Sequence, residues 1–172
     1  MQLNECPLID ADTIHQRIGE MARQIDQAYA GRHPVLLVTL SGAFLFAADL
    51  VRQLRTPVQI EFVRAQSYRG TQSATPLQLT GLNTETVVNR HVIVVEDIVD
   101  TGRTAHALTE QLQAHNPASI RLCALLDKPA RREVSVTADY VGFAIEDHFV
   151  VGYGLDYDGL YRQLPAIHVI EA

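Results

Sequence analysis

The amino-acid sequence predicts an α/β protein built on a mainly parallel, twisted sheet that is flanked by helices. Short, wholly apolar runs typical of buried strands alternate with patterns that repeat at helical spacing. Parallel strands need long crossover connections, usually helices, so this alternation indicates a sheet covered on both faces. The chain has 172 residues and neither an internal repeat nor a low-complexity linker, so we expect one domain over residues 1–172.

The first elements follow from local patterns. Residues 11–31 place Ile14, Ile18, Met21, Ile25 and Ala28 on one helical stripe. Asp12 or Thr13 is the expected cap of this helix and Gly31 its expected end. Three further elements are expected in this half: a buried strand at residues 34–40, a helix at residues 43–54 and an alternating strand at residues 57–68.

Residues 69–86 form the longest polar stretch and contain only two charged side chains. Long loops inside compact domains are often functional, so this segment is either a flexible lid or an extended hairpin with a mobile tip, and the two are compatible. The elements expected beyond it are a strand at residues 92–96, a helix to about residue 115, and strands at residues 119–127, 140–145 and 149–157.

Composition excludes several classes of protein. The formal charge of −6 argues against nonspecific nucleic-acid binding, which needs a basic face. No apolar run is long enough to span a bilayer, and the first ten residues lack the features of a secretory signal. Cys6 and Cys123 show no metal-ligand spacing, so a reduced, cytoplasmic setting fits best.

Three carboxylates follow the most apolar strand. Glu96, Asp97 and Asp100 come at its carboxyl end, which is the edge of a parallel sheet where ligands bind. Ionised carboxylates only accept hydrogen bonds. The adjacent pair Glu96 and Asp97 therefore suits a vicinal diol such as that of a ribose, or hydrated Mg²⁺.

A turn suited to phosphate comes directly after these acids. Thr101, Gly102 and Thr104 stand where the next helix begins, and the first N–H groups of a helix have no intrahelical acceptors. Gly102 allows close approach of the backbone. The alternative is that Asp100 or Thr101 only caps the helix, but a cap does not explain the two other acids.

The segment "VIVVEDIVDTGRT" resembles the phosphoribosyl pyrophosphate signature of type I phosphoribosyltransferases, in the form of the hypoxanthine(-guanine) branch. The stretches "ALLDKPARREV" and "FVVGYGLDYDGLYRQLP" resemble the base-binding and metal-binding segments of the same branch, so the resemblance covers nearly the whole chain. It implies the type I fold, with a small hood formed by N- and C-terminal segments.

The resemblance also implies an activity: transfer of phosphoribosyl from phosphoribosyl pyrophosphate to hypoxanthine and guanine, with Mg²⁺ as cofactor. The resemblance assigns ribose and phosphate binding to Glu96, Asp97, Asp100, Thr101, Gly102, Arg103 and Thr104, with Asp100 as the general base. It assigns purine binding to Lys128, Phe149 and Val150, and diphosphate binding to Ser41, Gly42 and Arg162. The metal ligands it implies are Asp156, Glu96 and Asp97, and the lid begins with Ser67 and Tyr68.

Some of these residues have simpler explanations when considered alone. Lys128 follows a buried strand, where its ammonium can donate to a 6-oxo group, but it also fits a solvated surface lysine. Phe149 fits a core position, and Asp156 and Arg162 each fit a surface charge. The resemblance, and not the residue types, favours the site.

The turn after the first buried strand departs from the family. Many members carry Lys or Arg before its glycine, whereas this chain has Ser41 before Gly42. The backbone can still bind diphosphate, and a cis peptide bond at Leu40–Ser41 is the family-like geometry. We expect diphosphate binding to depend more on Mg²⁺ and Arg162.

The resemblance implies a homodimer or homotetramer. It does not rank hypoxanthine against guanine or xanthine. The alternative function is a non-catalytic nucleotide-binding regulator of the same fold, which the acidic charge and intact Asp100 disfavour. A methyltransferase is a poor fit, because no strand is followed by G-x-G-x-x-G.

Overall fold

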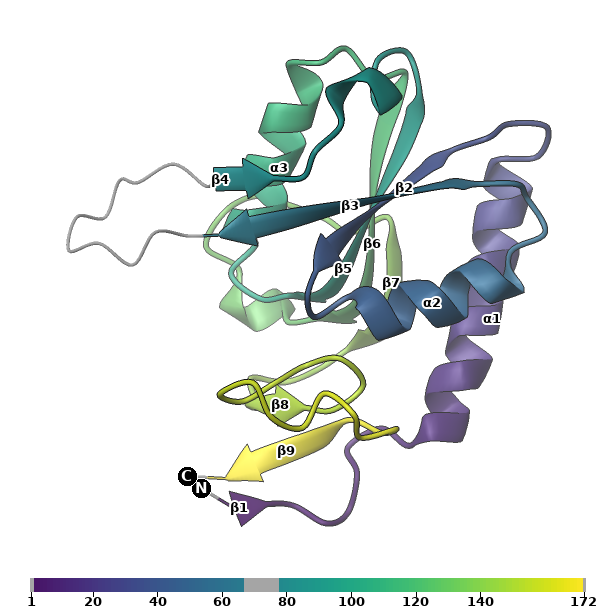
Figure 1. Cartoon of the computed structure of the whole chain (residues 1–172). Coiled ribbons are helices and arrows are strands. Elements are labelled where there is room, and N and C mark those ends of the chain that lie inside the picture. The colour runs from purple at the N-terminus through teal and green to yellow at the C-terminus, as the bar shows by residue number, and fades with distance from the viewer. Residues whose placement is uncertain (1, 67–77, 172) are drawn as a thin grey trace.

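The computed structural model describes residues 2–66 and 78–171 and shows a six-stranded sheet beside a three-stranded one (Figure 1). The large sheet has the order β4 (Gln78–Thr80), β3 (Gln59–Gln66), β2 (Val35–Leu40), β5 (His91–Val99), β6 (Ser119–Asp127) and β7 (Tyr140–Ala144). All neighbouring pairs in it are parallel except β3–β4. The type I fold expected from the resemblance is confirmed.

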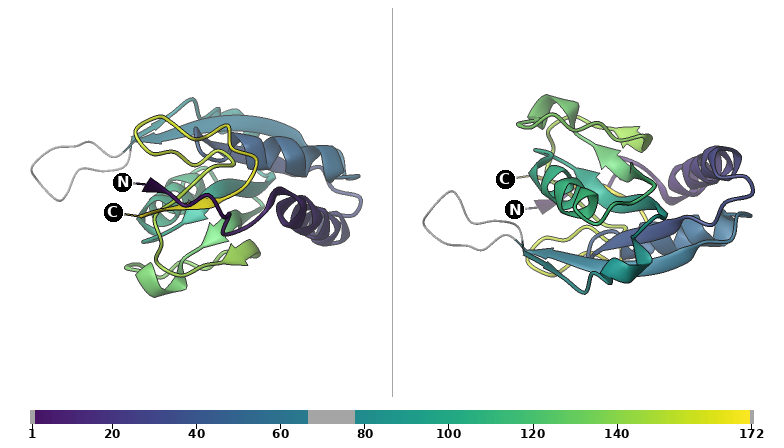
Figure 2. Two further views of the ribbon diagram at one scale, coloured as in Figure 1. Left: turned by 90° about the horizontal axis from the view of Figure 1, so that it is seen from below. Right: turned by 90° about the horizontal axis from the view of Figure 1, so that it is seen from above.

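Helices cover both faces of the large sheet (Figures 1 and 2). The helices are α1 (Ala11–Ala28), α2 (Phe44–Gln53) and α3 (Arg103–Gln113), with short 3₁₀ turns η1 (Thr84–Thr86) and η2 (Pro129–Arg131). Successive strand residues point to opposite faces, so Ile93 and Val95 of β5 join the core cluster under α1 and α2. Val92 and Val94 join the cluster under α3.

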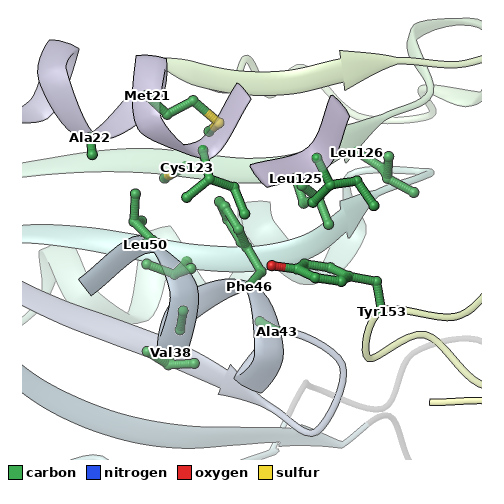
Figure 3. Packing of buried hydrophobic residues seen from close by; sticks show 14 of the residues in the cluster. Met21, Ala22, Val38, Ala43, Phe46, Leu50, Cys123, Leu125, Leu126 and Tyr153 are labelled. Carbon is green, nitrogen blue, oxygen red and sulfur yellow. The ribbon is translucent and has the colours of Figure 1, made fainter. Parts of the chain in front are cut away.

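The core under α1 and α2 is closely packed. Phe46 and Leu50 of α2 are fully buried, and Figure 3 shows the Phe46 ring pointing toward the side of the sheet that carries Cys123 and Leu125. Burying such a side chain contributes about 1.5–3 kcal/mol. This core holds rigid the strands whose carboxyl ends form the site described below.

The three-stranded sheet joins the two ends of the chain. Its order is β1 (Gln2–Leu3), β9 (His168–Glu171) and β8 (Val150–Val151), all antiparallel. Strands β1 and β9 lie side by side in Figure 1, and Ile9 forms a bridge with Ile167. This small sheet is the hood expected from the resemblance.

Several element boundaries differ from the sequence-based expectations. The cap of α1 is Asp10, whose side chain accepts from Thr13 N at 2.8 Å, so the expectation of Asp12 or Thr13 was wrong. The strand expected at residues 149–157 is only β8, since the backbone turns to positive φ at Gly152 and Tyr153. Strand β5 continues to Val99, so Glu96 and Asp97 lie within it.

Part of the polar stretch 69–86 forms a hairpin arm. Strand β4 pairs with β3 in antiparallel register, with Arg64 opposite Thr80, and η1 follows it. Ser67 and Tyr68, the expected lid residues, lie outside the described residues. Within the ranges described, no helix is long and apolar enough to span a bilayer.

Candidate active site

A cleft of about 450 Å³ opens at the carboxyl ends of β2 and β5. It is lined by many of the residues that the sequence had indicated: Ser41, Gly42, Glu96, Asp97, Asp100, Thr101, Gly102, Thr104, Asp156 and Arg162. The neighbouring parallel strands β2 and β5 bring the first eight of these residues together, and the segment between β8 and β9 adds Asp156 and Arg162. The cleft is thus the expected ligand-binding edge of the sheet.

Glu96 is buried at the floor of the cleft and retains its proton. Burial, with a smaller contribution from Asp97, raises the pKa of Glu96 to about 8. Its Oε2 atom lies 2.5 Å from Thr39 Oγ1, which is also 2.9 Å from the carbonyl oxygen of Val95. The Thr39 hydroxyl has one proton, and the carbonyl can only accept. A neutral Glu96 that donates to Thr39 satisfies both contacts.

The other carboxyl oxygen of Glu96 has no partner. Among the described residues, Glu96 Oε1 is a buried side-chain oxygen without a hydrogen-bond partner. An unpaired buried oxygen is costly, and in a cleft it marks a place where a ligand donor or metal can bind. This unpaired atom marks a polar position on the floor of the cleft that a water molecule, a ligand donor or a metal ion would satisfy.

Asp97 lies against the turn that follows β2. A Cβ atom at Gly42 would lie 1.5 Å from Asp97 Oδ2, so residue 42 has no room for a side chain. On the other side, a Cβ atom at Gly154 would lie 2.1 Å from the Gly42 carbonyl oxygen. The Leu40–Ser41 peptide bond is cis, as the resemblance implied. Burial raises the pKa of Asp97, opposed by backbone hydrogen bonds such as that from Ile98 N at 2.9 Å.

The turn at residues 100–104 begins α3 without a side-chain cap. The N-cap is Gly102 at φ +83°, which makes no side-chain cap hydrogen bond, so Asp100 is not the cap. Thr101 Oγ1 accepts from Arg103 N at 3.4 Å, which is one weak contact with the first N–H group of the helix. A Cβ atom at Gly102 would lie 2.5 Å from Val136. The first-turn N–H groups that follow Arg103 are therefore available to an anion. Arg103 does not line the cleft and instead lies 2.5 Å from Glu133.

Asp156 and Arg162 form an ion pair on the opposite wall. Arg162 NH2 lies 2.6 Å from Asp156 Oδ1, and Arg162 also donates to the carbonyl oxygen of Gly154. Asp156 Oδ2 accepts from Gly159 N at 2.8 Å. Both side chains are partly exposed and line the cleft, so they are not isolated charges on the outer surface. In the described parts of the chain, no three metal-binding side chains form a cluster of their own.

The three residues assigned to the purine lie beside the cleft and not in its lining. Lys128 is 6% exposed, and its Nζ atom donates to the carbonyl oxygen of His148 at 2.7 Å, so it is not a solvated surface lysine. Phe149 is 53% exposed and meets Tyr157 edge-on, so it is not a core residue. Val150 is buried in β8. The backbone N–H group of Lys128 donates to the carbonyl oxygen of Val99 at 2.9 Å. Because Val99 precedes Asp100, this bond places the backbone of Lys128 next to Asp100.

The sequence reading missed four side chains at the site. Thr39 is the one polar residue in an otherwise apolar strand, and this feature of the sequence could have indicated that its side chain belongs to the site. Arg131 contacts the Asp100 carboxylate, and Arg132 donates to the Asp100 carbonyl oxygen at 2.6 Å. Asp147 lies between Arg131 and Lys128. The adjacent arginines after Lys128 were visible, but nothing local indicated their partners.

Known proteins of similar sequence and structure are phosphoribosyltransferases. A family model described as the phosphoribosyl transferase domain matches residues 10–158. The hypoxanthine phosphoribosyltransferase of Haemophilus influenzae is 43% identical over 162 residues, which cover 91% of this chain and 90% of that protein. A solved hypoxanthine-guanine phosphoribosyltransferase of Bacillus anthracis matches with a TM-score of 0.91 at 40% identity, covering 99% of this chain and 100% of that one.

A further solved structure bears on assembly. The hypoxanthine phosphoribosyl transferase of Trypanosoma cruzi matches with a TM-score of 0.92 at 36% identity, covering 99% of this chain and 93% of that one. That protein was studied for the role of its C-terminal region on oligomeric state and enzymatic activity.

Proposed function

Because the chain belongs to the phosphoribosyltransferase family, we propose that it is a purine salvage enzyme. It transfers the 5-phosphoribosyl group from phosphoribosyl pyrophosphate to hypoxanthine, and to guanine, releasing IMP or GMP and pyrophosphate. The observation that carries this proposal is one contiguous site: the cleft carboxylates, the open amino end of α3, and Lys128 beside Asp100. Relatives with hypoxanthine phosphoribosyltransferase names at 36–43% identity support it.

The sugar and its 5-phosphate bind between β5 and α3. The phosphate takes the turn of Thr101, Gly102 and Thr104, where first-turn N–H groups and hydroxyls donate to it. The ribose diol faces Glu96 and Asp97. The proton of neutral Glu96 is donated to Thr39, so its unpaired Oε1 atom serves as an acceptor for a ribose hydroxyl.

Lys128 selects the base. Its ammonium has three donors, of which one is used by the carbonyl oxygen of His148. A 6-oxo group accepts another, whereas the 6-amino group of adenine is a donor and leaves Lys128 unpaired. The exposed ring of Phe149 offers a flat face for stacking, and Val150 offers backbone groups to the purine edge.

Asp100 is the general base of the transfer. The N9 lone pair of the purine forms the bond to ribose C1 as the C1–O bond to diphosphate breaks with its electrons on the oxygen. The N7 proton passes to Asp100 and then to solvent. The sugar carries positive charge in such transition states, and the nearby carboxylates favour it.

The cleft also fits Mg²⁺, with Asp156, Glu96 and Asp97 as the residues that would hold it. Mg²⁺ is usually bound by one or two carboxylates together with substrate phosphates and water, so a cluster of three protein ligands is not required. The unpaired Glu96 Oε1 atom and the carboxylate oxygens that line the cleft are suitable ligands for the ion. When bound, the ion neutralises charge on the leaving diphosphate.

The diphosphate binds at the turn of Ser41 and Gly42, opposite Arg162. Ser41 stands where many family members have a cation, so Arg162 is the main cationic side chain of this subsite. Its guanidinium is already oriented by Asp156 and by the Gly154 carbonyl oxygen. The family resemblance assigns residues 69–86 as the lid, with Ser67 and Tyr68 at the start of the lid segment.

We also propose a cytoplasmic location, a single domain over residues 1–172 and assembly into a homodimer or homotetramer. Residues of the hood such as Ile167 share a core cluster with the large sheet, which supports one domain. Phe44, Ile60 and Phe62 are exposed large apolar side chains beside α2 and β3, and they line an apolar groove. A second copy of the chain would cover them. Light scattering on the purified protein and on Phe62→Glu measures the oligomeric state directly, and a monomeric wild type would refute assembly.

A product assay tests the enzymatic proposal. Hypoxanthine, guanine, xanthine and adenine are each incubated with phosphoribosyl pyrophosphate and Mg²⁺. We expect turnover of hypoxanthine and guanine and none of adenine. Absence of turnover on every base would refute the activity and leave a nucleotide-binding regulator. Preference for adenine would refute the role of Lys128.

A further inference from the structure

Arg131 joins the two ends of the purine site. It belongs to η2, which directly follows Lys128. Its Nε atom lies 3.3 Å from Asp100 Oδ1, and its NH1 atom lies 3.6 Å from Asp147 Oδ2. The other oxygen of Asp147 lies 3.5 Å from Lys128 Nζ. Four charges of alternating sign therefore run from Asp100 through Arg131 and Asp147 to Lys128.

The neighbouring Arg132 has a different task. It is largely buried, donates to the carbonyl oxygens of Val99 and Asp100, and pairs with Asp127. It thus fixes the backbone of Asp100, whereas Arg131 contacts the carboxylate. In the described part of the chain, Asp100 Oδ1 accepts from Arg131, and no hydrogen-bond donor contacts Asp100 Oδ2. One oxygen of the carboxylate is held, and the other is open to a substrate proton.

The geometry of a 6-oxopurine explains why such a chain is useful. O6 and N7 lie on the same edge of the ring, so their separation is fixed by the covalent structure of the base. A site that donates to O6 through Lys128 and accepts the N7 proton at Asp100 needs the same fixed separation between those two side chains. Asp100 and Asp147 are 40% and 53% exposed, so packing alone does not hold them.

We propose that Arg131 is a positioning residue that, with Asp147, sets the spacing of Asp100 and Lys128 for the O6–N7 edge of the purine. This inference rests on the proposed function. Arg131 orients Oδ1 of Asp100 so that Oδ2 meets the N7 proton, and Asp147 orients the Lys128 ammonium. Ion pairs this exposed contribute little to folding stability, so the effect of Arg131 is on orientation.

The test compares kcat and KM of Arg131→Ala, Arg131→Lys and Asp147→Asn with those of the wild type. Misplacement of a reacting group by about 1 Å costs on the order of 10²-fold in rate, so we expect Arg131→Ala to lower kcat at least about tenfold. Arg131→Lys, which keeps the charge, should recover part of that loss. Asp147→Asn should raise KM for hypoxanthine more than KM for phosphoribosyl pyrophosphate. Arg121→Ala is the matched control, because Arg121 is an exposed arginine paired with Asp139 outside the cleft.

A double-mutant cycle separates positioning from a structural effect. If Arg131 acts through Asp100, Arg131→Ala should have little further effect on kcat in an Asp100→Asn background. Equal losses in both backgrounds, or an unchanged kcat in Arg131→Ala, would overturn the inference. Wild-type protein that turns over no purine would instead overturn the proposed function, so the two failures are distinguishable.

Discussion

Replacing Glu96 by Gln should change how the stability of the free protein depends on pH. The pKa of Glu96 is raised to about 8 in the folded protein, against 4.5 for an ordinary glutamate. Between these two values the folded state holds a proton that the unfolded chain has released. The free energy of unfolding therefore falls as pH rises through this window, is highest below about pH 4.5, and levels off above about pH 8.

The magnitude follows from the difference between the two pKa values. At about 1.36 kcal/mol per pKa unit, Glu96 changes the free energy of unfolding by about 5 kcal/mol in all, of which about 3 to 4 kcal/mol falls between pH 5 and pH 8. The amide that Glu96→Gln introduces stays neutral, and its N–H can donate to Thr39 as the protonated acid does. The variant should therefore lack this part of the pH dependence.

Urea unfolding of the wild type and Glu96→Gln at pH 5, 6, 7 and 8, with EDTA present, measures the effect. The variant should gain stability relative to the wild type with increasing pH, approaching about 1.4 kcal/mol per pH unit in mid-window. Glu85→Gln, which changes an exposed carboxylate, is the control and should track the wild type. Parallel curves for the wild type and Glu96→Gln would show that Glu96 is ionised, and would refute the hydrogen-bond assignment at Thr39.

Three further changes test the rest of the site. Asp100→Asn should lower kcat for hypoxanthine by on the order of 10²-fold or more, since an amide cannot accept the N7 proton; steady-state assays at saturating substrate measure it, and an unaffected rate would assign the proton to another group. Arg162→Ala should raise KM for phosphoribosyl pyrophosphate by about tenfold, because it removes charge-assisted hydrogen bonds to the diphosphate; an unchanged KM argues against Arg162 in that subsite. Gly42→Ala should destabilise the protein by about 1–3 kcal/mol or more in urea unfolding, because its Cβ would lie 1.5 Å from Asp97 Oδ2. Gly31→Ala reports a backbone cost without a clash, because Gly31 has φ +71° and a Cβ there meets nothing within 4 Å, whereas Gly42 has no positive φ. Unchanged stability of Gly42→Ala would refute the clash with Asp97.

Local patterns predicted the elements that are long and strongly patterned. Strand β6 has the bounds expected from the sequence, and α1 carries its buried residues on the expected stripe. Strands β1, β8 and β9 contain two to four residues each, and β1 and β9 were not expected. A strand that short has too few residues to show periodicity, and it forms because the two ends of the chain pair with each other.

The sequence by itself predicted that the segment from Glu96 to Thr104 lies at the cleft, because its acids, its glycine and its place after a buried strand are local features. The tertiary structure alone decided the state of those groups. Glu96 holds its proton because the packed strands bury it beside Asp97. Asp100 is oriented by Arg131 from the turn after β6. The chemical type of a side chain is given by the residue itself, whereas the protonation state and orientation of that side chain depend on burial and on partners distant in the chain.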